Sequence, residues 1–386
     1  RTLAADIVQS VSLDRLVEDR KKFLGGGFQA NRMDILLKAQ VVCSTLSGSG
    51  SQTLIETIMQ SAKAPPNAQA KGKGKGKGKK KAKGVDGGSG MLSFDAVVMD
   101  EAAQAVEPSS LIPLKLNPRV VVMVGDPAQL PATIFSREAD GANFGQSLFL
   151  RLQRGGHSKL MLDTQYRMHP SIASFASSRF YHGLLRSAPT VTEASHAQNF
   201  HRLPRFAPYL FHNVSAGRLK RGAAGTASTS LSNPVEVTYI ASLLKDLVCS
   251  FPGTNFNGRI GVITPYRNQI QALEQGMWTT GLRQDGVEIS TVDGFQGREK
   301  DIMVFSCVRA PEEEGSELAG RKAGVGFMDD WRRLNVAITR AKYAMWIVGH
   351  SGVLKQSQEW RELINDSRRR DAFVDYSAPP PSSGAG

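Results

Sequence analysis

Two adjacent carboxylates, Asp100 and Glu101, follow directly after a run of apolar residues, FDAVVM (94–99). Phosphoryl transfer to water needs Mg²⁺, an oriented water molecule and positive charge next to the transferred group. Asp100 is suited to hold the metal, and Glu101 is suited to orient or deprotonate the water. The alternative is a pair of solvated carboxylates at a strand end, and the Asp-Glu pair alone does not decide between the two.

A second apolar run ends in VGDPAQLPAT (124–133), which contains Gln129. Gly125 and Pro127 predict a tight turn, which would be an ordinary feature by itself. The amide of Gln129 can both donate and accept, so it can hydrogen-bond a γ-phosphate and a catalytic water without reversing the local charge. Next to the Asp-Glu pair, this turn favours a role in nucleotide hydrolysis.

The stretch LDTQYRMHP (162–170) places Tyr166 beside Arg167. An arginine supplied from a second domain can neutralise charge in the transition state, an effect of about 10³–10⁵ in rate. The tyrosine ring is suited to stack on an adenine base. The alternative is a core tyrosine beside a surface arginine.

Two glycines, Gly294 and Gly297, flank Phe-Gln in ISTVDGFQGREKD (289–301). Glycine lets the backbone approach a ligand closely. Glu299, just after the second glycine, could bind a ribose hydroxyl.

The stretch WRRLNVAITRAK (331–342) predicts one helix that carries Arg333, Asn335, Thr339 and Arg340. Arg340 comes seven residues after Arg333, so the two would lie on the same helical face. The alternative, which is the commoner use of spaced arginines, is a basic face in contact with water.

TPYRNQ (264–269) follows another apolar run. Thr264 and Arg267 can contact phosphates, and Tyr266 has the size to meet a base or a sugar. Because the stretch has a single aromatic residue, it is a weak indication of nucleic-acid binding by itself.

The chemistry-bearing residues follow short, continuous apolar runs, which predict strands covered on both faces of a parallel sheet. These runs occupy residues 94–100, 119–126, 259–266, 301–308 and 343–350. A helical pattern lies between them in NPVEVTYIASLLKDLV (233–248), where Asn233 can cap the helix and Pro234 suits its first turn. Its apolar face would consist of Ile240, Leu243, Leu244, Leu247 and Val248. The alternation predicts a doubly wound α/β fold, in which ligands bind beyond the carboxyl ends of the strands.

We expect two sheet domains with a boundary near residue 163. Residues 1–162 would form the first domain, 163–353 the second, and 354–386 a C-terminal extension that is disordered from about residue 371. A lysine–glycine segment, about 62–92, is predicted to be a disordered insertion, because nothing in it could bury a core.

The net charge of +13 at pH 7 indicates polyanionic partners, and the eight lysines of KGKGKGKGKKKAK (71–83) account for all but +5 of it. That run could be a nuclear address, an RNA tether or a solvated linker. Cys43, Cys249 and Cys307 lie far apart and form no disulfide or zinc pattern. No apolar run approaches the roughly 18 residues of a membrane span, and no signal peptide opens the chain, so we expect no membrane partner.

Six stretches together resemble the motifs of superfamily 1B helicases of the Upf-like group, and most closely the senataxin/Sen-type RNA–DNA helicases. DEAAQ, GDPAQLP, QYRMHP, TPYRNQ, VDGFQGREKD and RRLNVAITRAK are similar, in chain order, to motifs II, III, IV, IVa, V and VI. VVCSTLSGSG (41–50) and FSCVRA (305–310) also resemble the senataxin branch. The likeness extends from about residue 35 to residue 352, and six motifs in order are far more specific than any one of them.

The resemblance implies two RecA-like (P-loop NTPase) domains with parallel sheets, the first of them incomplete, and ATP with Mg²⁺ in the cleft between them. It implies an ATP-hydrolysing, 5′-to-3′ helicase that tracks single-stranded RNA or DNA and unwinds RNA–DNA hybrids. Such a helicase would act in the nucleus as a monomer, in transcription termination or RNA processing, with partners in that machinery.

The resemblance also implies roles for single residues. The catalytic set would be Asp100 at Mg²⁺, Glu101 as the base, Gln129 at the γ-phosphate, and Arg167 and Arg340 as arginine fingers. The nucleotide-binding set would be Tyr166 on the adenine, Glu299 on the ribose, and Gln165 and Gly297 near them. The residues near the nucleic acid would be Thr264, Tyr266, Arg267 and Thr291.

One expected motif, the phosphate-binding loop G-x-x-x-x-G-K-[ST], does not occur in the 386 residues. The lysine run cannot replace it, because its glycines fall two apart instead of five. We expect the loop upstream of Arg1 and interpret the chain as an N-terminally truncated helicase core. Two alternatives are a nucleic-acid-binding module without ATP turnover and a cytoplasmic Upf-type RNA-surveillance helicase.

Overall fold

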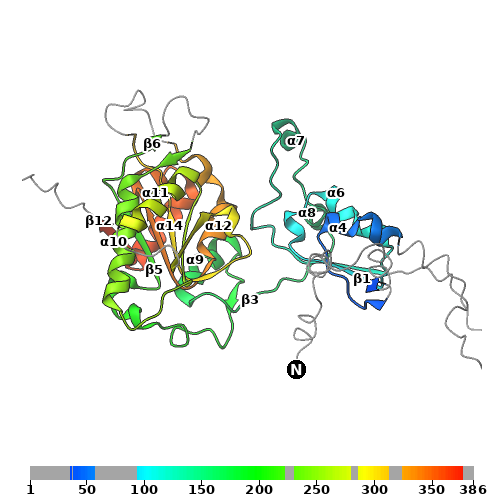
Figure 1. Cartoon of the computed structure of the whole chain (residues 1–386), viewed down its shortest axis with the longest axis horizontal. Coiled ribbons are helices and arrows are strands. Elements are labelled where there is room, and N and C mark those ends of the chain that lie inside the picture. The colour runs from blue at the N-terminus through cyan, green and yellow to red at the C-terminus, as the bar shows by residue number, and fades with distance from the viewer. Residues whose placement is uncertain are drawn as a thin grey trace, which may run out of the picture. The chain divides into compact units, whose positions relative to one another are not determined.

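The computed structural model describes residues 35–56, 94–221, 230–279, 286–312 and 324–376, apart from Leu37 and the side chain of Phe327. The lysine–glycine segment that was predicted to be a disordered insertion lies outside these residues. The chain divides into two compact units (Figure 1). Unit 1 comprises the residues up to Pro127 together with Pro131–Lys159, and unit 2 comprises Ala128–Leu130 and the residues from Leu160 onward.

Unit 1 contains two parallel strands, β1 (Ala96–Met99) and β2 (Val120–Met123). Its helices are α4 (Leu46–Ser49), α6 (Glu107–Leu111), α7 (Arg137–Gly141) and α8 (Leu148–Arg154), and its 3-10 turns are η1 (Ala102–Gln104) and η2 (Pro113–Leu116). Val97 and Met99 pack in a small core, whereas Val98 on the opposite face is 68% exposed. The expectation of strands covered on both faces therefore does not hold for this pair.

Unit 2 is built on a six-stranded sheet in which all neighbouring strands are parallel, in the order β12-β5-β11-β10-β8-β9. The strands are β5 (Tyr209–Val214), β8 (Ile260–Thr264), β9 (Val287–Thr291), β10 (Lys300–Ser306), β11 (Ala341–Gly349) and β12 (Phe373–Tyr376). The helices are α9 (Pro170–Phe180), α10 (Pro234–Ser250), α11 (Arg267–Thr279), α12 (Trp331–Ile338), α13 (Ser351–Leu354) and α14 (Gln358–Arg369). The predicted α/β class with parallel strands is confirmed.

Unit 2 also contains shorter elements. Two small ladders pair β3 (Thr164–Gln165) with β4 (Arg186–Ser187), and β6 (Lys220–Arg221) with β7 (Leu231–Ser232). The 3-10 turns are η3 (Asn199–Arg202), η4 (Pro204–Phe206), η6 (Asp293–Phe295) and η7 (Gly326–Asp329).

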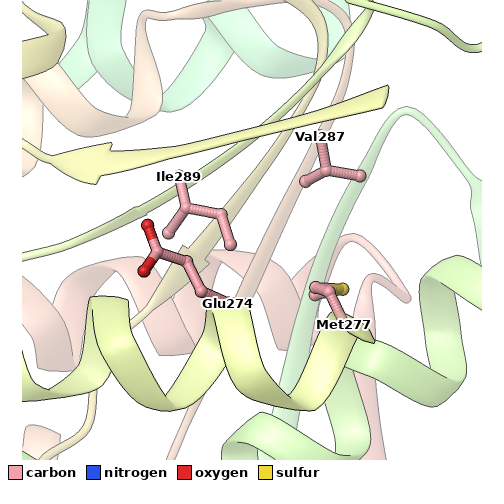
Figure 2. A pocket seen from close by; sticks show the side chains of 4 residues that line it. All are labelled: Glu274, Met277, Val287 and Ile289. Atoms are coloured by element: carbon pink, nitrogen blue, oxygen red, sulfur yellow. The ribbon is translucent and has the colours of Figure 1, made fainter. Parts of the chain in front are cut away.

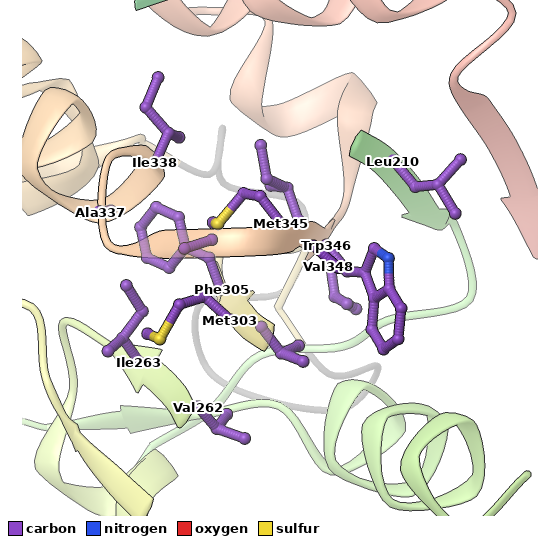
Figure 3. Packing of buried hydrophobic residues seen from close by; sticks show 14 of the residues in the cluster. Leu210, Val262, Ile263, Met303, Phe305, Ala337, Ile338, Met345, Trp346 and Val348 are labelled. Atoms are coloured by element: carbon purple, nitrogen blue, oxygen red, sulfur yellow. The ribbon is translucent and has the colours of Figure 1, made fainter. Parts of the chain in front are cut away.

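Apolar side chains cover both faces of the central strands of unit 2. Figure 3 shows Met303 and Phe305 of β10 near Met345 of β11, whereas Trp346 of β11 points to the other side, and all four are buried. Consecutive residues of a strand point to opposite faces of the sheet, so the burial of both Met345 and Trp346 requires cover on each face. This is why the sequence of these strands is continuously apolar rather than alternating.

The helix predicted between the sheet strands forms as α10. The side chain of Asn233 accepts a hydrogen bond from the backbone amide of Glu236 at 3.2 Å, and Pro234 begins the helix. Four of the five predicted apolar residues are buried, and Val248 packs against the same core while partly exposed. No helix in the described ranges is both long enough and apolar enough to cross a membrane.

The C-terminal extension belongs to the core of unit 2. Trp360 of α14 is fully buried, and its indole nitrogen donates to the carbonyl of Met328 at 2.7 Å. β12 pairs with β5 in parallel from Phe373 to Tyr376. The prediction of disorder from about residue 371 is therefore wrong for residues 371–376, because a four-residue edge strand carries too short a pattern and forms through a distant partner. Residues 377–386 lie outside the described ranges.

Candidate nucleotide and nucleic-acid sites

Asp100 and Glu101 lie in the turn that follows β1, and both are exposed. The amide of Glu101 donates to Oδ1 of Asp100 at 2.9 Å, and Gln104 donates to Oε2 of Glu101 at 2.6 Å. Glu101 has a φ of 51°, in the left-handed region that residues with a side chain rarely adopt. Both predicted carboxylates are thus oriented by local hydrogen bonds at the carboxyl end of a strand.

The turn after β2 packs directly against the turn after β1. The amide of Ala102 donates to the carbonyl of Val124 at 2.8 Å. A Cβ at Gly125 would lie 2.7 Å from the backbone nitrogen of Ala103, so only glycine allows this approach. The structure therefore brings the first two predicted motifs together at one edge of unit 1.

The donor set at this edge fits a magnesium ion. Mg²⁺ is typically held by one or two carboxylates, with water and substrate phosphates completing its coordination. Asp100 supplies an exposed carboxylate with one oxygen bound to an amide, and Glu101 supplies a second beside it. No group of three or more acidic, histidine or cysteine side chains that could hold a metal occurs in the described part of the chain.

Gln129 belongs to a short segment that groups with unit 2, although the rest of its motif lies in unit 1. Leu130 is buried in the core of unit 2. The carbonyl of Ala128 accepts a hydrogen bond from Nδ2 of Asn335 at 2.9 Å. Contacts on both sides of Gln129 therefore hold it against the second unit.

Gln165 builds the turn that presents its two neighbours. Its Nε2 donates to the carbonyl of Met168 at 2.9 Å and to Ser187, and its Oε1 accepts from the amides of Arg167 and Met168. The side chain is buried, so its polar atoms serve the protein itself. Tyr166 is 71% exposed, so the alternative that it is a core residue is wrong. Its ring is accessible for stacking.

Arg167 is held by two acceptors rather than by solvent. Its Nε donates to the carboxylate of Glu299, and its Nη1 donates to the carbonyl of Thr339 at 3.1 Å. Nζ of Lys342 lies 2.9 Å from the other oxygen of Glu299. Partial burial would raise the pKa of Glu299, but hydrogen bonds from Lys342 and Arg167 outweigh it and lower that pKa. Glu299, predicted at a ribose, thus lies between two cations.

Arg340 is only 3% exposed and follows α12 instead of lying on it. Its Nε donates to the carbonyl of Val336 at 3.0 Å, and its Nη2 donates to the hydroxyl of Thr339 at 3.1 Å. The prediction of one helix with Arg333 and Arg340 on the same face is wrong, because the helix ends at Ile338 and Arg340 directly precedes β11, which begins at Ala341. A solvated basic face is equally excluded for Arg340.

Arg333 has a different role from Arg340. Its guanidinium binds Asp293 through Nε at 2.9 Å and through Nη2 at 3.1 Å. Gly297, a few residues after Asp293, has a φ of 74°, a backbone conformation that favours glycine. Arg333 therefore ties α12 to the turn that leads to Gly297 and Glu299.

The four residues predicted at nucleic acid gather at the carboxyl ends of β8 and β9. Thr264 and Thr291 are register partners there. The Thr264 side chain is fully buried, and its hydroxyl has no hydrogen-bond partner among the described residues. Thr291 accepts from the amide of Gly294 at 3.0 Å. Arg267, the first residue of α11, is exposed.

Tyr266 differs from the expected surface ring. It is buried, and its hydroxyl accepts from Nε of Arg309 at 2.6 Å, while the arginine carbon Cζ lies 5.4 Å from the ring centre. Burial, the dominant cause, raises the pKa of Tyr266. In this arrangement Tyr266 supports Arg309 and does not itself present a face to a base.

Glu236 was missed as a polar centre next to this edge. Its Oε2 accepts from the hydroxyl of Ser306 at 2.7 Å and from the amide of Val308 at 2.9 Å, and its Oε1 accepts from Asn233. Complete burial raises the pKa of Glu236 to about 8, although these hydrogen bonds oppose the rise. Val308 has a φ of 66°, unusual for a branched residue. The sequence feature that could have indicated this centre is FSCVRA (305–310), which contains its partners Ser306 and Val308.

A shallow pocket lies between α11 and β9 (Figure 2). Glu274 and Met277 line it from the helix, and Val287 and Ile289 line it from the strand. Among the described residues that line it there is no predicted site residue, and Glu274 is the polar one. The predicted site residues lie at the strand ends and not among the described residues of this pocket.

Family models and relatives agree with these motifs. A model described as an AAA domain matches residues 144–352, and a second with the same description matches residues 82–137. Helicase SEN1 of Saccharomyces cerevisiae is 37% identical over 343 residues, which are 88% of this chain and 13% of SEN1. Probable helicase senataxin of Mus musculus is 31% identical over 93% of this chain and 12% of its own length. ATP-dependent helicase upf1 of Schizosaccharomyces pombe is 37% identical over 73% of this chain and 29% of its own length.

The chain spans 12% to 29% of the length of these three proteins. The first AAA-domain match covers more than half of the chain and includes the Arg167, Glu299 and Arg340 segments. The second reaches the Asp100–Glu101 pair and Gln129. The chain therefore belongs to the AAA-domain helicases of superfamily 1B, the Upf-like group that includes the Sen-type helicases.

Proposed function

We propose that the protein containing this chain is an ATP-hydrolysing helicase that moves 5′ to 3′ on single-stranded RNA or DNA and unwinds RNA–DNA hybrids. The observation that carries the proposal is a hydrogen-bonded cluster in unit 2 that joins Arg167, Glu299, Thr339 and Arg340. Two guanidinium groups held on one residue suit the neutralisation of charge on a transferred phosphoryl group.

The carboxylates of unit 1 would supply the metal and the base. Mg²⁺, when bound, would neutralise charge on the phosphate oxygens, and Asp100 is the residue that would hold it. Glu101 would take a proton from the attacking water, and the hydrogen bond from Gln104 orients its carboxylate.

The remaining nucleotide contacts would come from unit 2. Arg167 and Arg340 would neutralise charge that develops on the γ-phosphate, and the amide of Gln129 would hydrogen-bond that phosphate. The exposed ring of Tyr166 would stack on the adenine. Glu299 would bind the ribose with the oxygen atoms that also hold Arg167 and Lys342.

Single-stranded nucleic acid would lie along the carboxyl ends of β8 and β9. Arg267 would contact a phosphate, because it is exposed and begins α11 at this edge. Thr264, Tyr266 and Thr291 would shape the edge beneath it. This assignment accounts for the burial of Thr264 and Tyr266.

We place the helicase in the nucleus, in transcription termination or RNA processing, with that machinery as partner. The support is the likeness to SEN1 and senataxin over 88% and 93% of this chain. A cytoplasmic RNA-surveillance role is the second candidate, because the upf1 helicase is 37% identical, the same value as SEN1.

The test is ATP hydrolysis by the full-length protein with and without single-stranded RNA, and unwinding of RNA–DNA hybrids with a 5′ or a 3′ overhang. Glu101→Gln should abolish turnover and keep ATP binding, whereas Glu138→Gln, an exposed glutamate of unit 1, should leave turnover unchanged. Hydrolysis by Glu101→Gln at the wild-type rate would remove Glu101 from its role. RNA binding without hydrolysis by the wild type would favour a binding module.

A further inference from the structure

The last turn of α12 is a point where separate segments of the chain meet. Asn335 and Thr339 lie four residues apart, and the Thr339 hydroxyl donates to the carbonyl of Asn335 at 2.8 Å. Both side chains are buried. Ala337 and Ile338 of the same turn pack in the hydrophobic core (Figure 3), which fixes the turn against the sheet.

Asn335 holds the segment that carries Gln129. Its Nδ2 donates to the carbonyl of Ala128 at 2.9 Å and to the hydroxyl of Tyr181 at 2.8 Å. Because a carbonyl can only accept, the nitrogen of the amide must face Ala128. Gln129 is thus held between this hydrogen bond and the buried side chain of Leu130.

Packing alone does not account for Asn335. Its Oδ1 is buried and has no hydrogen-bond partner among the described residues. Leaving a buried polar atom unpaired costs free energy, and an apolar side chain would fill the place without that cost. The hydrogen bonds to Ala128 and Tyr181 are therefore what distinguish asparagine from leucine at this position, and only the first of them reaches the segment of Gln129.

Thr339 holds both predicted arginine fingers. Its carbonyl accepts from Nη1 of Arg167 at 3.1 Å, and its hydroxyl accepts from Nη2 of Arg340 at 3.1 Å. The hydroxyl donates its proton to the carbonyls of Asn335 at 2.8 Å and Val336 at 3.2 Å, so its lone pairs remain available to Arg340. One residue thus accepts hydrogen bonds from two guanidinium groups, in addition to the bonds from Arg167 to Glu299 and from Arg340 to Val336.

We infer that Asn335 and Thr339 are positioning residues for ATP hydrolysis, an inference that rests on the proposed function. They join Gln129, Arg167 and Arg340 into one rigid arrangement and contact no nucleotide themselves. A displacement of about 1 Å in such groups can cost about 10² in rate. Their effect belongs to the transition state, in which charge develops, and not to the binding of ATP.

The experiment compares two matched pairs of variants in the full-length protein. Asn335→Ala removes the bond to Ala128, and Tyr181→Phe removes only the other partner of the same amide. Thr339→Val removes the acceptor for Arg340, and Thr339→Ser restores it. The readouts are kcat and KM for RNA-stimulated ATP hydrolysis, and the affinities for ADP and for ADP with aluminium fluoride.

Asn335→Ala and Thr339→Val should lower kcat by about 10- to 100-fold with KM for ATP within about 2-fold. The affinity for ADP should remain that of the wild type, and the affinity for ADP with aluminium fluoride should fall by the same factor as kcat. Tyr181→Phe should stay within about 3-fold of wild type, and Thr339→Ser should recover most of the loss. If one variant does not fold, as judged by thermal unfolding, the other pair decides.

If Asn335→Ala and Thr339→Val both turn over ATP at the wild-type rate, the inference is overturned and the proposed function is unaffected. An equal loss in Tyr181→Phe and Thr339→Ser would also overturn it, since the effect would then be one of packing. A loss confined to KM would assign the two residues to ATP binding and contradict the inference. A wild-type protein that does not hydrolyse ATP would overturn the proposed function, and this inference with it.

Discussion

The guanidinium of Arg167 donates to the carboxylate of Glu299, a residue 132 positions later in the chain. Lys342 binds the other oxygen of the same carboxylate at 2.9 Å. Two residues that were predicted to bind different parts of a nucleotide therefore bind each other. The position of the Arg167 guanidinium next to a phosphate would therefore depend on whether the Glu299 carboxylate is charged and still bound to it.

Glu299→Gln should impair hydrolysis more than ATP binding. Glutamine keeps the size of the side chain but cannot offer a charged acceptor to both Arg167 and Lys342. A hydrogen bond to a charged group is worth about 1.5–3 kcal/mol, so we expect kcat to fall roughly 10-fold or more, with a smaller rise in KM. Steady-state kinetics of the full-length protein measures both.

The control for Glu299 is Glu362→Gln, which removes a carboxylate that pairs with Arg179 at 2.9 Å elsewhere in unit 2. It should leave kcat unchanged. Because the pKa of Glu299 is lowered from 4.5, its charge persists above that value and its contribution is lost only as the pH falls below it. If the rate of ATP hydrolysis changed with pH near neutrality in the wild type and this change disappeared in Glu299→Gln, this account would be contradicted.

Arg340→Ala should slow ATP hydrolysis by at least roughly 10²-fold, somewhat below the range of known arginine fingers. The side chain is buried and fixed by Val336 and Thr339, so its position is set before any ligand binds. RNA binding should be retained. Arg369→Ala, at an arginine whose side chain is 72% exposed, is the matched control. Equal rates in the two variants would reduce Arg340 to a structural residue.

Arg267→Ala should weaken nucleic-acid binding without changing RNA-independent hydrolysis. An exposed arginine that contacts one phosphate contributes about one unit to the slope of log K against log salt concentration. We expect that slope to decrease by about 1, measured by fluorescence anisotropy with single-stranded RNA at several salt concentrations. An unchanged slope would place the nucleic acid elsewhere; Arg369→Ala again serves as the control.

Glu236→Gln should change how stability depends on pH. Burial raises the pKa of Glu236 from 4.5 to about 8, so the folded state binds this proton more tightly than the unfolded state. Stability contributed by this group is therefore lost as the pH rises between those two values. We expect the free energy of unfolding of the wild type to fall in this window, by up to about 1.4 kcal/mol per pH unit, relative to Glu236→Gln.

Urea unfolding followed by tryptophan fluorescence measures this effect, because all four tryptophans of the chain lie in unit 2. His201 and His212 act in the opposite direction, since burial lowers the pKa of each from 6.5 to about 4. Wild type and variant must therefore be compared at the same pH. If the free energies of unfolding of wild type and Glu236→Gln change in parallel with pH across this window, the pKa of Glu236 is not raised in the folded protein.

Local sequence was sufficient for the parts of the fold that depend on neighbours in the chain. The apolar runs that end at Asp100 and Thr264 lie in parallel strands, and Asn233 caps α10 as its position predicts. A continuous apolar run followed by a polar turn is a local pattern, and a capping side chain bonds to an amide three residues away. Such contacts can be inferred from spacing alone.

Tertiary structure alone decided which polar residues are buried and which partners they have. Tyr166 and Tyr266 both stand before an arginine in the sequence, yet the first is 71% exposed and the second 5%. Tyr266 is buried because it packs in a cluster with Leu219, Leu231 and Val308, and Arg309, 43 positions away, donates to its hydroxyl. Thr339 likewise meets Arg167 across 172 positions. Sequence periodicity carries local geometry, whereas burial and ion pairing depend on contacts between distant segments, which only the folded chain brings together.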